Sequence, residues 1–195
     1  MTIAGLLLAG GESRRMGGDD KGRLAWQGTP MASRVAAAMT AVVPALIVSA
    51  NRHPAFYRSL GRWLVSDPPG LRWQGPLVGL LAGLECARQE GFAAVLVCPC
   101  DTPTVTPSLL AHVLAAYHEA PERPLMAEVD GRVHPLHGVV PVALAEDLAE
   151  YLSAGERRVF RFFRQHDGRQ VNCDAFAAQF TNRNTPDDLC QETSD

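Results

Sequence analysis

The chain has 195 residues, 47% of them hydrophobic, and a formal net charge of −3. This length suits a single domain covering residues 1–195, and the apolar content is sufficient for a sizeable core. The weak negative charge argues against nucleic acid or an anionic membrane as a partner, and no apolar run approaches the length of a membrane span.

The cysteines and the N-terminus indicate a cytoplasmic protein. The chain has five cysteines, an odd number, without any Cys-x-x-Cys spacing, which fits a reducing compartment. The only close pair, Cys98 and Cys100, is expected to be two small residues at the end of a buried strand; a metal or redox role is the weaker alternative. The first apolar run lacks a preceding basic region and is too short for a secretory signal.

The first predicted element is a buried strand over residues 3–8, which ends at Gly10 and Gly11. A glycine-rich loop follows and carries Arg14, Arg15 and Lys21. Glycine lets backbone N–H groups approach a ligand closely, and successive N–H groups form a concave anion site. The loop therefore predicts a cradle for a nucleoside triphosphate, the alternative being a plain strand-to-helix turn with solvated charges.

Two better-known phosphate-binding motifs do not fit this loop. The P-loop requires lysine directly after glycine and then serine or threonine, whereas Lys21 follows Asp20 and precedes Gly22. The dinucleotide fingerprint requires one residue between its first two glycines and an acidic residue about twenty positions later. Here the first two glycines are adjacent, and the second predicted strand ends without an acidic residue.

Strand and helix patterns then alternate, which favours βαβ units and a mostly parallel sheet. In chain order we predict a helix over 30–43, strands over 45–50 and 62–66, a helix from Pro76, a strand over 93–98 at the sheet centre, and a helix from Pro107.

The last third has a different organisation. Two strands, 125–130 and 132–140, flank the hairpin signal Asp130-Gly131. A helix over 141–152, another helix starting near Gly155, a strand over 170–173 and a terminal helix capped by Thr185 follow. The prediction is an α/β fold, predominantly parallel, with an antiparallel addition in this last third.

Polar residues follow the predicted parallel strands. Asn51, Asp67 and Asp101 come directly after the second, third and fourth strands. Ligands of open parallel sheets bind outside the carboxyl ends of the strands, so these side chains are expected to converge. Asp101 is the best candidate ligand for a hard cation such as Mg²⁺; its alternative role is to initiate a turn.

Three groups of residues give the chain a family resemblance. The segments Leu8-Ala9-Gly10-Gly11, Arg14-Arg15-Met16-Gly17-Gly18 and Asp20-Lys21-Gly22 together resemble the molybdenum cofactor guanylyltransferases. The run from Cys98 to Pro103, Gly75-Pro76-Leu77 and the final Asn182-Arg183-Asn184-Thr185-Pro186 extend the likeness over nearly the whole chain. The resemblance implies a three-layer Rossmann-like nucleotidyltransferase fold.

The resemblance also implies a reaction and a site. GMP would pass from GTP to molybdenum-bearing molybdopterin, giving the guanine dinucleotide cofactor and pyrophosphate, with Mg²⁺ as cofactor. The implied catalytic residues are Arg15, Lys21 and Asp101, the last also holding the metal. The implied GTP-binding residues are Leu8, Ala9, Gly10, Gly11, Gly18, Lys21, Asn51, Asp67, Gly75 and Asp101.

The implied molybdopterin-binding residues are Asn182 and Asn184, which lie two apart in an extended segment and therefore point the same way. Their alternative role is to shape a turn before the terminal helix. The chain departs from the family at Ser49, where asparagine is more usual, so a base contact at that position is not carried over.

Other functions stay open at this level. The nearest rivals are a molybdopterin cytidylyltransferase and a sugar-phosphate nucleotidyltransferase. A different class is a non-catalytic nucleotide-binding adaptor in cofactor assembly, against which Lys21 and Asp101 argue. The implied partners besides the two substrates are cofactor-delivery proteins or apo-molybdoenzymes, in transient contact.

Overall fold

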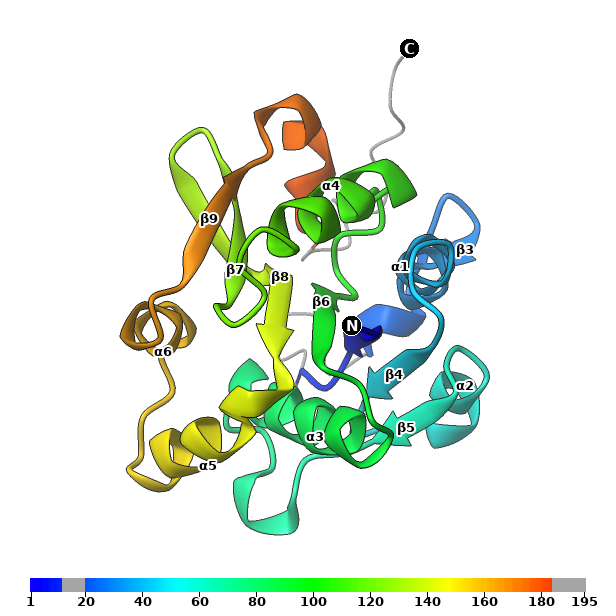
Figure 1. Ribbon diagram of the computed structural model, residues 1–195. Helices are drawn as coiled ribbons and strands as arrows, with labels where there is room; N and C mark the ends of the chain where they lie inside the picture. Colours follow the sequence, from blue (N-terminus) through cyan, green and yellow to red (C-terminus); the bar gives the residue numbers. More distant parts are fainter. Residues whose placement is uncertain (12–19, 184–195) are drawn as a thin grey trace.

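A seven-stranded sheet forms the centre of the computed structural model, which describes residues 1–11 and 20–183 (Figure 1). The strand order is β5-β4-β1-β6-β8-β7-β9, which places β6 in the middle, as predicted for residues 93–98. The strands are β1 (Ile3–Leu8), β4 (Leu46–Ser49), β5 (Trp63–Val65), β6 (Ala94–Pro99), β7 (Leu125–Val129), β8 (Arg132–Pro141) and β9 (Arg169–Asn172). A separate two-stranded sheet is formed by β2 (Ala25–Trp26) and β3 (Thr29–Pro30).

Most of the large sheet is parallel. β1 pairs in parallel with β4 and β6, and β4 pairs in parallel with β5. β8 runs antiparallel to both of its neighbours, β6 and β7, whereas β9 pairs in parallel with β7. The predicted fold class is therefore confirmed, and the antiparallel part of the sheet consists of β8 alone.

Helices cover both faces of the sheet and give three layers (Figure 1). One face packs against α1 (Met31–Thr40) and α4 (Pro107–Tyr117). The other packs against α3 (Pro76–Gln89), α5 (Ala145–Ser153) and α6 (Val159–Gln165). The short helix α2 (Pro54–Arg58) follows β4. No helix in the described part of the chain is both long and apolar enough to span a membrane.

β1 is buried along its whole length because both of its faces are covered. Leu7 packs in the cluster under α1 and α4, and Leu6 packs in the cluster under α3. Gly83 of α3 lies directly on Leu6, where a β-carbon would collide with the leucine side chain. A continuous apolar run is therefore required in this strand, in place of the alternating pattern of a half-exposed one.

Some boundaries differ from the sequence predictions. Pro141 belongs to β8, and the helix expected from residue 141 begins at Ala145 after a 3₁₀ turn at Val142–Leu144. Proline is compatible with this strand end because it lacks only the N–H donor. The helix α2 and the hairpin of β2 and β3 were not predicted, because each is too short for a periodic pattern. The predicted terminal helix from Thr185 lies outside the described residues.

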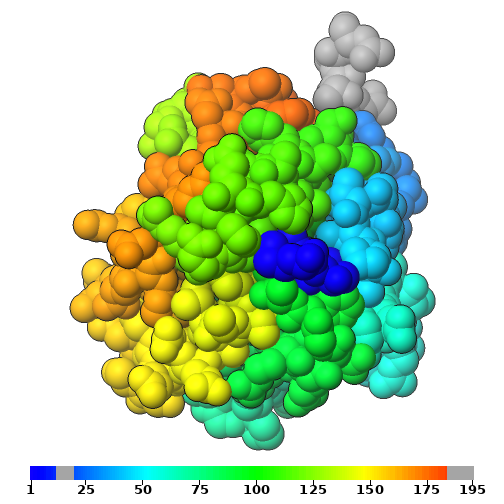
Figure 2. Space-filling model, viewed as in Figure 1, coloured from blue at the N-terminus to red at the C-terminus, as the bar shows by residue number. Residues whose placement is uncertain are grey.

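The N-terminus lies at the end of the sheet opposite the carboxyl ends of the parallel strands. Figure 2 shows this face, with the N-terminal segment (dark blue) at the surface between green and light-blue segments. Met1 is 61% exposed there.

β8 carries an irregular bulge of three residues opposite β7. Met126 pairs with Gly138 and the next residue, Ala127, pairs with His134, so residues 135–137 have no partners on β7. Gly138 ends the bulge where its backbone passes very close to Leu125, and a β-carbon would run into the Leu125 carbonyl oxygen. A bulge re-aims the side chains that it carries, and this one directs residues toward the carboxyl end of β6.

We expect Gly138→Ala to destabilise the fold, because the obstructing atom belongs to the backbone and cannot rotate away. Overpacking of this kind costs about 1–3 kcal/mol, which corresponds to a fall in Tm of roughly 2–12 °C. Thermal unfolding of the variant measures the effect. Gly70→Ala is the matched control, because a β-carbon there meets nothing within 4 Å; equal Tm values for the two variants would contradict the prediction.

Candidate active site

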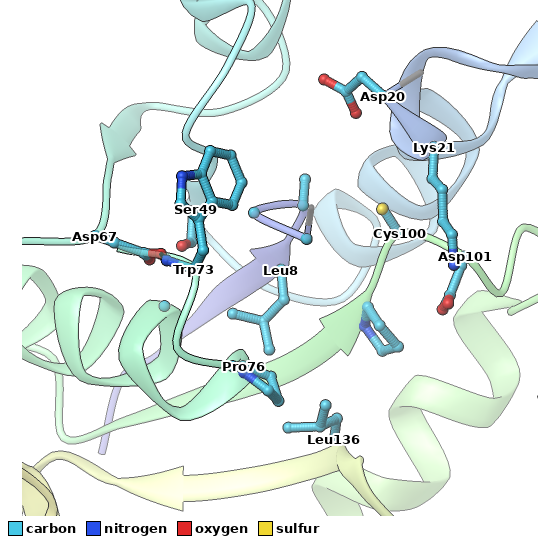
Figure 3. Close-up of a pocket in the computed structure, with 16 residues that line it drawn as sticks. Leu8, Asp20, Lys21, Ser49, Asp67, Trp73, Pro76, Cys100, Asp101 and Leu136 are labelled. Atoms are coloured by element: carbon cyan, nitrogen blue, oxygen red, sulfur yellow. Dashed lines mark hydrogen bonds between the residues drawn. The ribbon is translucent and has the colours of Figure 1, made fainter. Parts of the chain in front are cut away.

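A cavity of about 320 Å³ lies at the carboxyl ends of β1, β4 and β6 (Figure 3). Its lining combines glycines, four charged side chains, an indole ring and apolar residues. The lining residues are Leu8, Ala9, Gly10, Gly11, Asp20, Lys21, Ser49, Asp67, Trp73, Gly75, Pro76, Gly79, Pro99, Cys100, Asp101 and Leu136.

The floor of the cavity is the end of β1, which the neighbouring strands fix from both sides. Ala9 N donates to Ser49 O at 2.8 Å, and Cys100 N donates to Leu8 O at 3.0 Å. Beyond this point Gly11 has open space around it. The backbone of the glycine loop is thus rigid where it leaves the sheet and accessible where it enters the cavity.

The Asn51 side-chain amide joins the residues that follow β1 and β5. Its Nδ2 donates to Gly10 O at 3.1 Å and to Asp67 Oδ2 at 2.8 Å, and its Oδ1 accepts from Asp67 N at 2.9 Å. Asn51 itself does not line the cavity. Its predicted contact with GTP stays a prediction, and the observed contacts give it a role in positioning Gly10 and Asp67.

Trp73 forms one wall of the cavity through an unusual backbone conformation. Its φ of 64° is in the left-handed region, which costs energy for a bulky residue. Its backbone N–H donates to Asp67 Oδ2 at 3.2 Å, and the Arg52 guanidinium lies 4.9 Å from the centroid of its ring. These two contacts hold the indole beside the Asp67 carboxylate.

Lys21 enters the cavity from a 3₁₀ turn, Lys21–Arg23. Asp20 caps this turn by accepting from Gly22 N at 3.2 Å. Figure 3 shows the Lys21 side chain extending toward Asp101 across the cavity from Asp67. The positive charge therefore lies next to the carboxylate that follows β6.

Asp101 has the properties of a cation ligand. Its Oδ1 is buried and accepts no hydrogen bond from any residue that the structure describes. Burial raises the pKa of the Asp101 carboxyl above its ordinary value, and the Lys21 charge and a backbone hydrogen bond offset only part of that effect. A buried oxygen with unused acceptor capacity fits a hard divalent cation.

The bulge of β8 completes the site around Asp101. It places Leu136 in the cavity wall and His137 against Thr102, the residue after Asp101. His137 Nε2 lies 3.0 Å from Thr102 Oγ1. Burial lowers the pKa of His137 to about 3, so the ring is neutral at physiological pH. The contact therefore supports the Asp101 turn without adding charge to the cavity.

The segment predicted to bind molybdopterin runs beside Asp101. Arg183 N donates to Asp101 O at 2.8 Å. Asn182 is exposed next to this bond, and the Arg183 guanidinium lies 5.7 Å from the centroid of the Trp26 ring. Asn182 thus lies close to the cavity without lining it, whereas Asn184 lies outside the described residues.

The cavity brings together most of the residues expected to bind GTP. These are Leu8, Ala9, Gly10, Gly11, Lys21, Asp67, Gly75 and Asp101. Arg15 and Gly18 lie outside the described residues. Gly75 has a φ of 103°, which other residues rarely adopt, directly before Pro76 starts α3.

Sequence reasoning missed other lining residues, among them Trp73 and Leu136. Composition and periodicity do not distinguish them from core residues, since a loop conformation and a bulge direct them inward. The likeness of His134-Pro135-Leu136 to a segment of the family was the one available signal for Leu136. Gly79 could have been found as a glycine inside a helix; a β-carbon there would lie 2.7 Å from Ser49 Oγ.

Cys98 and Cys100 are buried, as predicted, and neither is in a disulfide. Burial raises the pKa of the Cys98 thiol to about 12 and also raises the pKa of Cys100, so both remain protonated at neutral pH. A thiolate metal site is therefore disfavoured, and the described residues contain no cluster of three or more metal-ligating side chains.

We expect Asp101→Asn to raise the Tm of the ligand-free protein at neutral pH. Because the pKa of Asp101 is raised on folding, the wild type loses stability as the pH rises from the ordinary carboxyl pKa through the raised one. The advantage of Asp101→Asn should grow over that interval and then level off, which unfolding between about pH 4 and pH 8 would measure. Glu150→Gln, at an exposed carboxylate, is the control; a lower Tm for Asp101→Asn at neutral pH would contradict the prediction.

Comparisons with known proteins agree with this geometry. Residues 5–171 match the model of the MobA-like NTP transferase domain. A molybdenum cofactor guanylyltransferase of Cereibacter sphaeroides is 42% identical over 194 residues, covering 100% of this chain and 97% of the relative.

Solved structures share the fold. The molybdopterin-guanine dinucleotide biosynthesis protein A of Archaeoglobus fulgidus superposes with a TM-score of 0.76 at 22% identity, over 97% of this chain and 95% of that chain. Rv0371c of Mycobacterium tuberculosis H37Rv, solved as a complex with manganese, has a TM-score of 0.61 at 17% identity over 89% of each chain. From its sequence relatives and the domain match, this chain belongs to the molybdenum cofactor guanylyltransferase family.

Proposed function

We propose that this chain transfers GMP from GTP to molybdenum-bearing molybdopterin, giving the guanine dinucleotide cofactor and pyrophosphate. The observation that carries the proposal is the single cavity in which the glycine loop, Lys21 and Asp101 meet. This combination supplies anion donors, a fixed positive charge and a cation ligand at the switch point of a parallel sheet.

The triphosphate would lie over Gly10 and Gly11, where the backbone is accessible. Lys21 would contact the phosphates from the opposite side of the cavity. Its charge becomes most effective as negative charge grows on the transferring group. Arg15, which precedes Lys21 in the same loop, is proposed to assist it.

The guanine base would lie against the Trp73 ring, within reach of the Asp67 carboxylate. The Asp67 carboxylate lines the cavity and can accept hydrogen bonds from the ring N–H and the amino group of guanine. Asn51 would act indirectly by holding Asp67. Its Nδ2 donates to the Asp67 carboxylate, and its Oδ1 accepts from the Asp67 backbone N–H.

Asp101 is the residue that would hold Mg²⁺, because its buried Oδ1 has no other partner among the described residues. When bound, the ion would supply positive charge to the phosphate oxygens. Rv0371c, which shares the fold, binds manganese in its solved structure, and the donor set here would accept either ion.

The reaction needs no general base from the protein, because the acceptor is an ionised phosphate. An oxygen of the molybdopterin phosphate forms a bond to the α-phosphorus of GTP. The bond from that phosphorus to the bridging oxygen breaks on the opposite side, and pyrophosphate leaves with the electron pair. The chain's contribution is to align the two phosphates and stabilise their charge.

The acceptor would approach from the side of Asn182. The bond from Arg183 N to the Asp101 carbonyl oxygen keeps this segment against the carboxyl end of β6. An exposed amide can donate and accept at once, which suits the mixed edge of a pterin. Asn184 is proposed to share this role.

The product would be formed in the cytoplasm, where GTP is available and free thiols such as those of this chain persist. Transient contact with a cofactor-delivery protein or an apo-molybdoenzyme would pass the product on.

Nucleotide selectivity tests the proposal. Pyrophosphate release in the presence of molybdopterin and Mg²⁺ should be at least about 100-fold more efficient with GTP than with CTP or ATP, because the wrong base leaves buried polar groups unpaired. Asp101→Asn is the control and should greatly raise the Mg²⁺ requirement. Equal use of CTP and GTP would contradict the guanylyl assignment, and binding without turnover would favour an adaptor.

A second prediction concerns Asn182. Asn182→Ala should weaken molybdopterin binding by about 3- to 30-fold, as expected for the loss of one or two hydrogen bonds, and leave GTP affinity within about twofold. Separate titrations of each ligand measure both effects. Asn172→Ala, at an exposed asparagine on β9, is the control; weaker GTP binding with unchanged molybdopterin binding would move Asn182 to the nucleotide side.

A further inference from the structure

We infer that Tyr57 is a positioning residue for Lys21. It acts through Asp20 and Gly22, the two neighbours of Lys21 in the sequence, by a hydrogen bond to the first and by packing against the second. Tyr57 lies on α2, more than thirty positions from Lys21 in the sequence, and does not line the cavity. The inference rests on the proposed role of Lys21 in the transfer reaction.

The contacts converge on the turn that carries Lys21. The Tyr57 hydroxyl donates to Asp20 Oδ1 at 2.5 Å, and the same oxygen accepts from Gly22 N at 3.2 Å. The residue before Lys21 and the residue after it are therefore tied to one point. Burial raises the pKa of the Tyr57 hydroxyl, so the proton that it donates is retained.

Packing fixes the same turn a second time. Gly22 is buried against Tyr57, and a β-carbon at this position would collide with the tyrosine hydroxyl and lie 3.1 Å from Ala32 Cβ. The φ of Gly22 is not positive, so its backbone conformation does not require glycine. The close approach of the Tyr57 hydroxyl therefore explains the glycine at this position. The hydroxyl fills the space that a side chain at position 22 would need.

α2 is itself held in place beside the turn. Tyr57 is fully buried in the core cluster that also contains residues of α1 and α4, and Phe56 packs against the same cluster. Arg23 Nη1 lies 2.9 Å from His53 Nδ1, at the start of the helix. Two separate contacts thus join α2 to the turn, one at its N-cap residue His53 and one at Tyr57 near its C-terminal end.

The position of this turn matters because the lysine side chain is long and flexible. With four methylene groups between backbone and charge, the ammonium group reaches one place reproducibly only if the backbone is fixed. Displacement of a catalytic group by about 1 Å can cost up to about 100-fold in rate. Loss of the Tyr57 hydroxyl would loosen the turn while the charge stays in the cavity.

Tyr57→Phe tests the inference, because it removes the hydroxyl and keeps the ring. We expect the single-turnover rate of pyrophosphate release to fall about 5- to 30-fold while GTP affinity changes less than about threefold, as for a group needed mainly in the transition state. Tyr117→Phe is the matched control. Tyr117 is also fully buried, its hydroxyl donates to the backbone oxygen of Pro121, four positions later, and it does not line the cavity. This variant should lower Tm comparably and leave the rate unchanged.

A double-mutant cycle with Lys21→Ala separates positioning from general damage. If Tyr57 acts through Lys21, Tyr57→Phe should cost less than about twofold in the Lys21→Ala background, measured with enzyme in excess. An unchanged rate for Tyr57→Phe alone, or the same loss in both backgrounds, would overturn the inference. A wild-type chain that releases no pyrophosphate, or a fully active Lys21→Ala, would instead overturn the proposed function or the role of Lys21 in it.

Discussion

The arrangement of the site depends on the Asn51 side chain, which joins two strand ends that no backbone pairing connects directly. It donates to the Gly10 carbonyl and to the Asp67 carboxylate, and accepts from the Asp67 N–H. Gly10 and Gly11 line the cavity, and Asp67 supports the backbone of Trp73. Because these groups lie at the edge of a cavity, loss of the amide would leave buried polar groups without partners. The part of the site proposed to bind the nucleotide is thus held together by one residue that does not line the cavity.

The segment that follows β4 contacts the site on two sides, through Asn51 and through Tyr57. Asn51 fixes the end of β1 and the loop after β5, and a few residues later α2 brings Tyr57 to the turn that carries Lys21. A short segment therefore positions both the wall formed by Asp67 and Trp73 and the turn that carries Lys21. The glycines at positions 10 and 22 fit the same explanation, because each passes close to a side chain of this segment.

Asp101 illustrates a conflict between stability and activity. A buried carboxylate is unfavourable in the absence of a cation, and this is the physical reason for its raised pKa. The protein tolerates it because the surrounding turn is held firmly, by Arg183 N on the Asp101 carbonyl and by His137 on Thr102. The bond from Arg183 N links the proposed metal ligand Asp101 to the segment proposed to receive molybdopterin. Destabilisation concentrated in one side chain is typical of a functional site.

The sequence by itself determined the fold class, the glycine loop and the family. These follow from local patterns: apolar runs that fit buried strands, glycines and charges at fixed spacing, and polar residues directly after strands. Most of the residues expected at the site do line one cavity, because the carboxyl ends of parallel strands must share an edge. The bulge that places Leu136 and His137, the left-handed conformation of Trp73 and the contact of Tyr57 with Asp20 needed the tertiary structure. Each depends on a partner distant in the sequence, and local propensity does not encode such pairings.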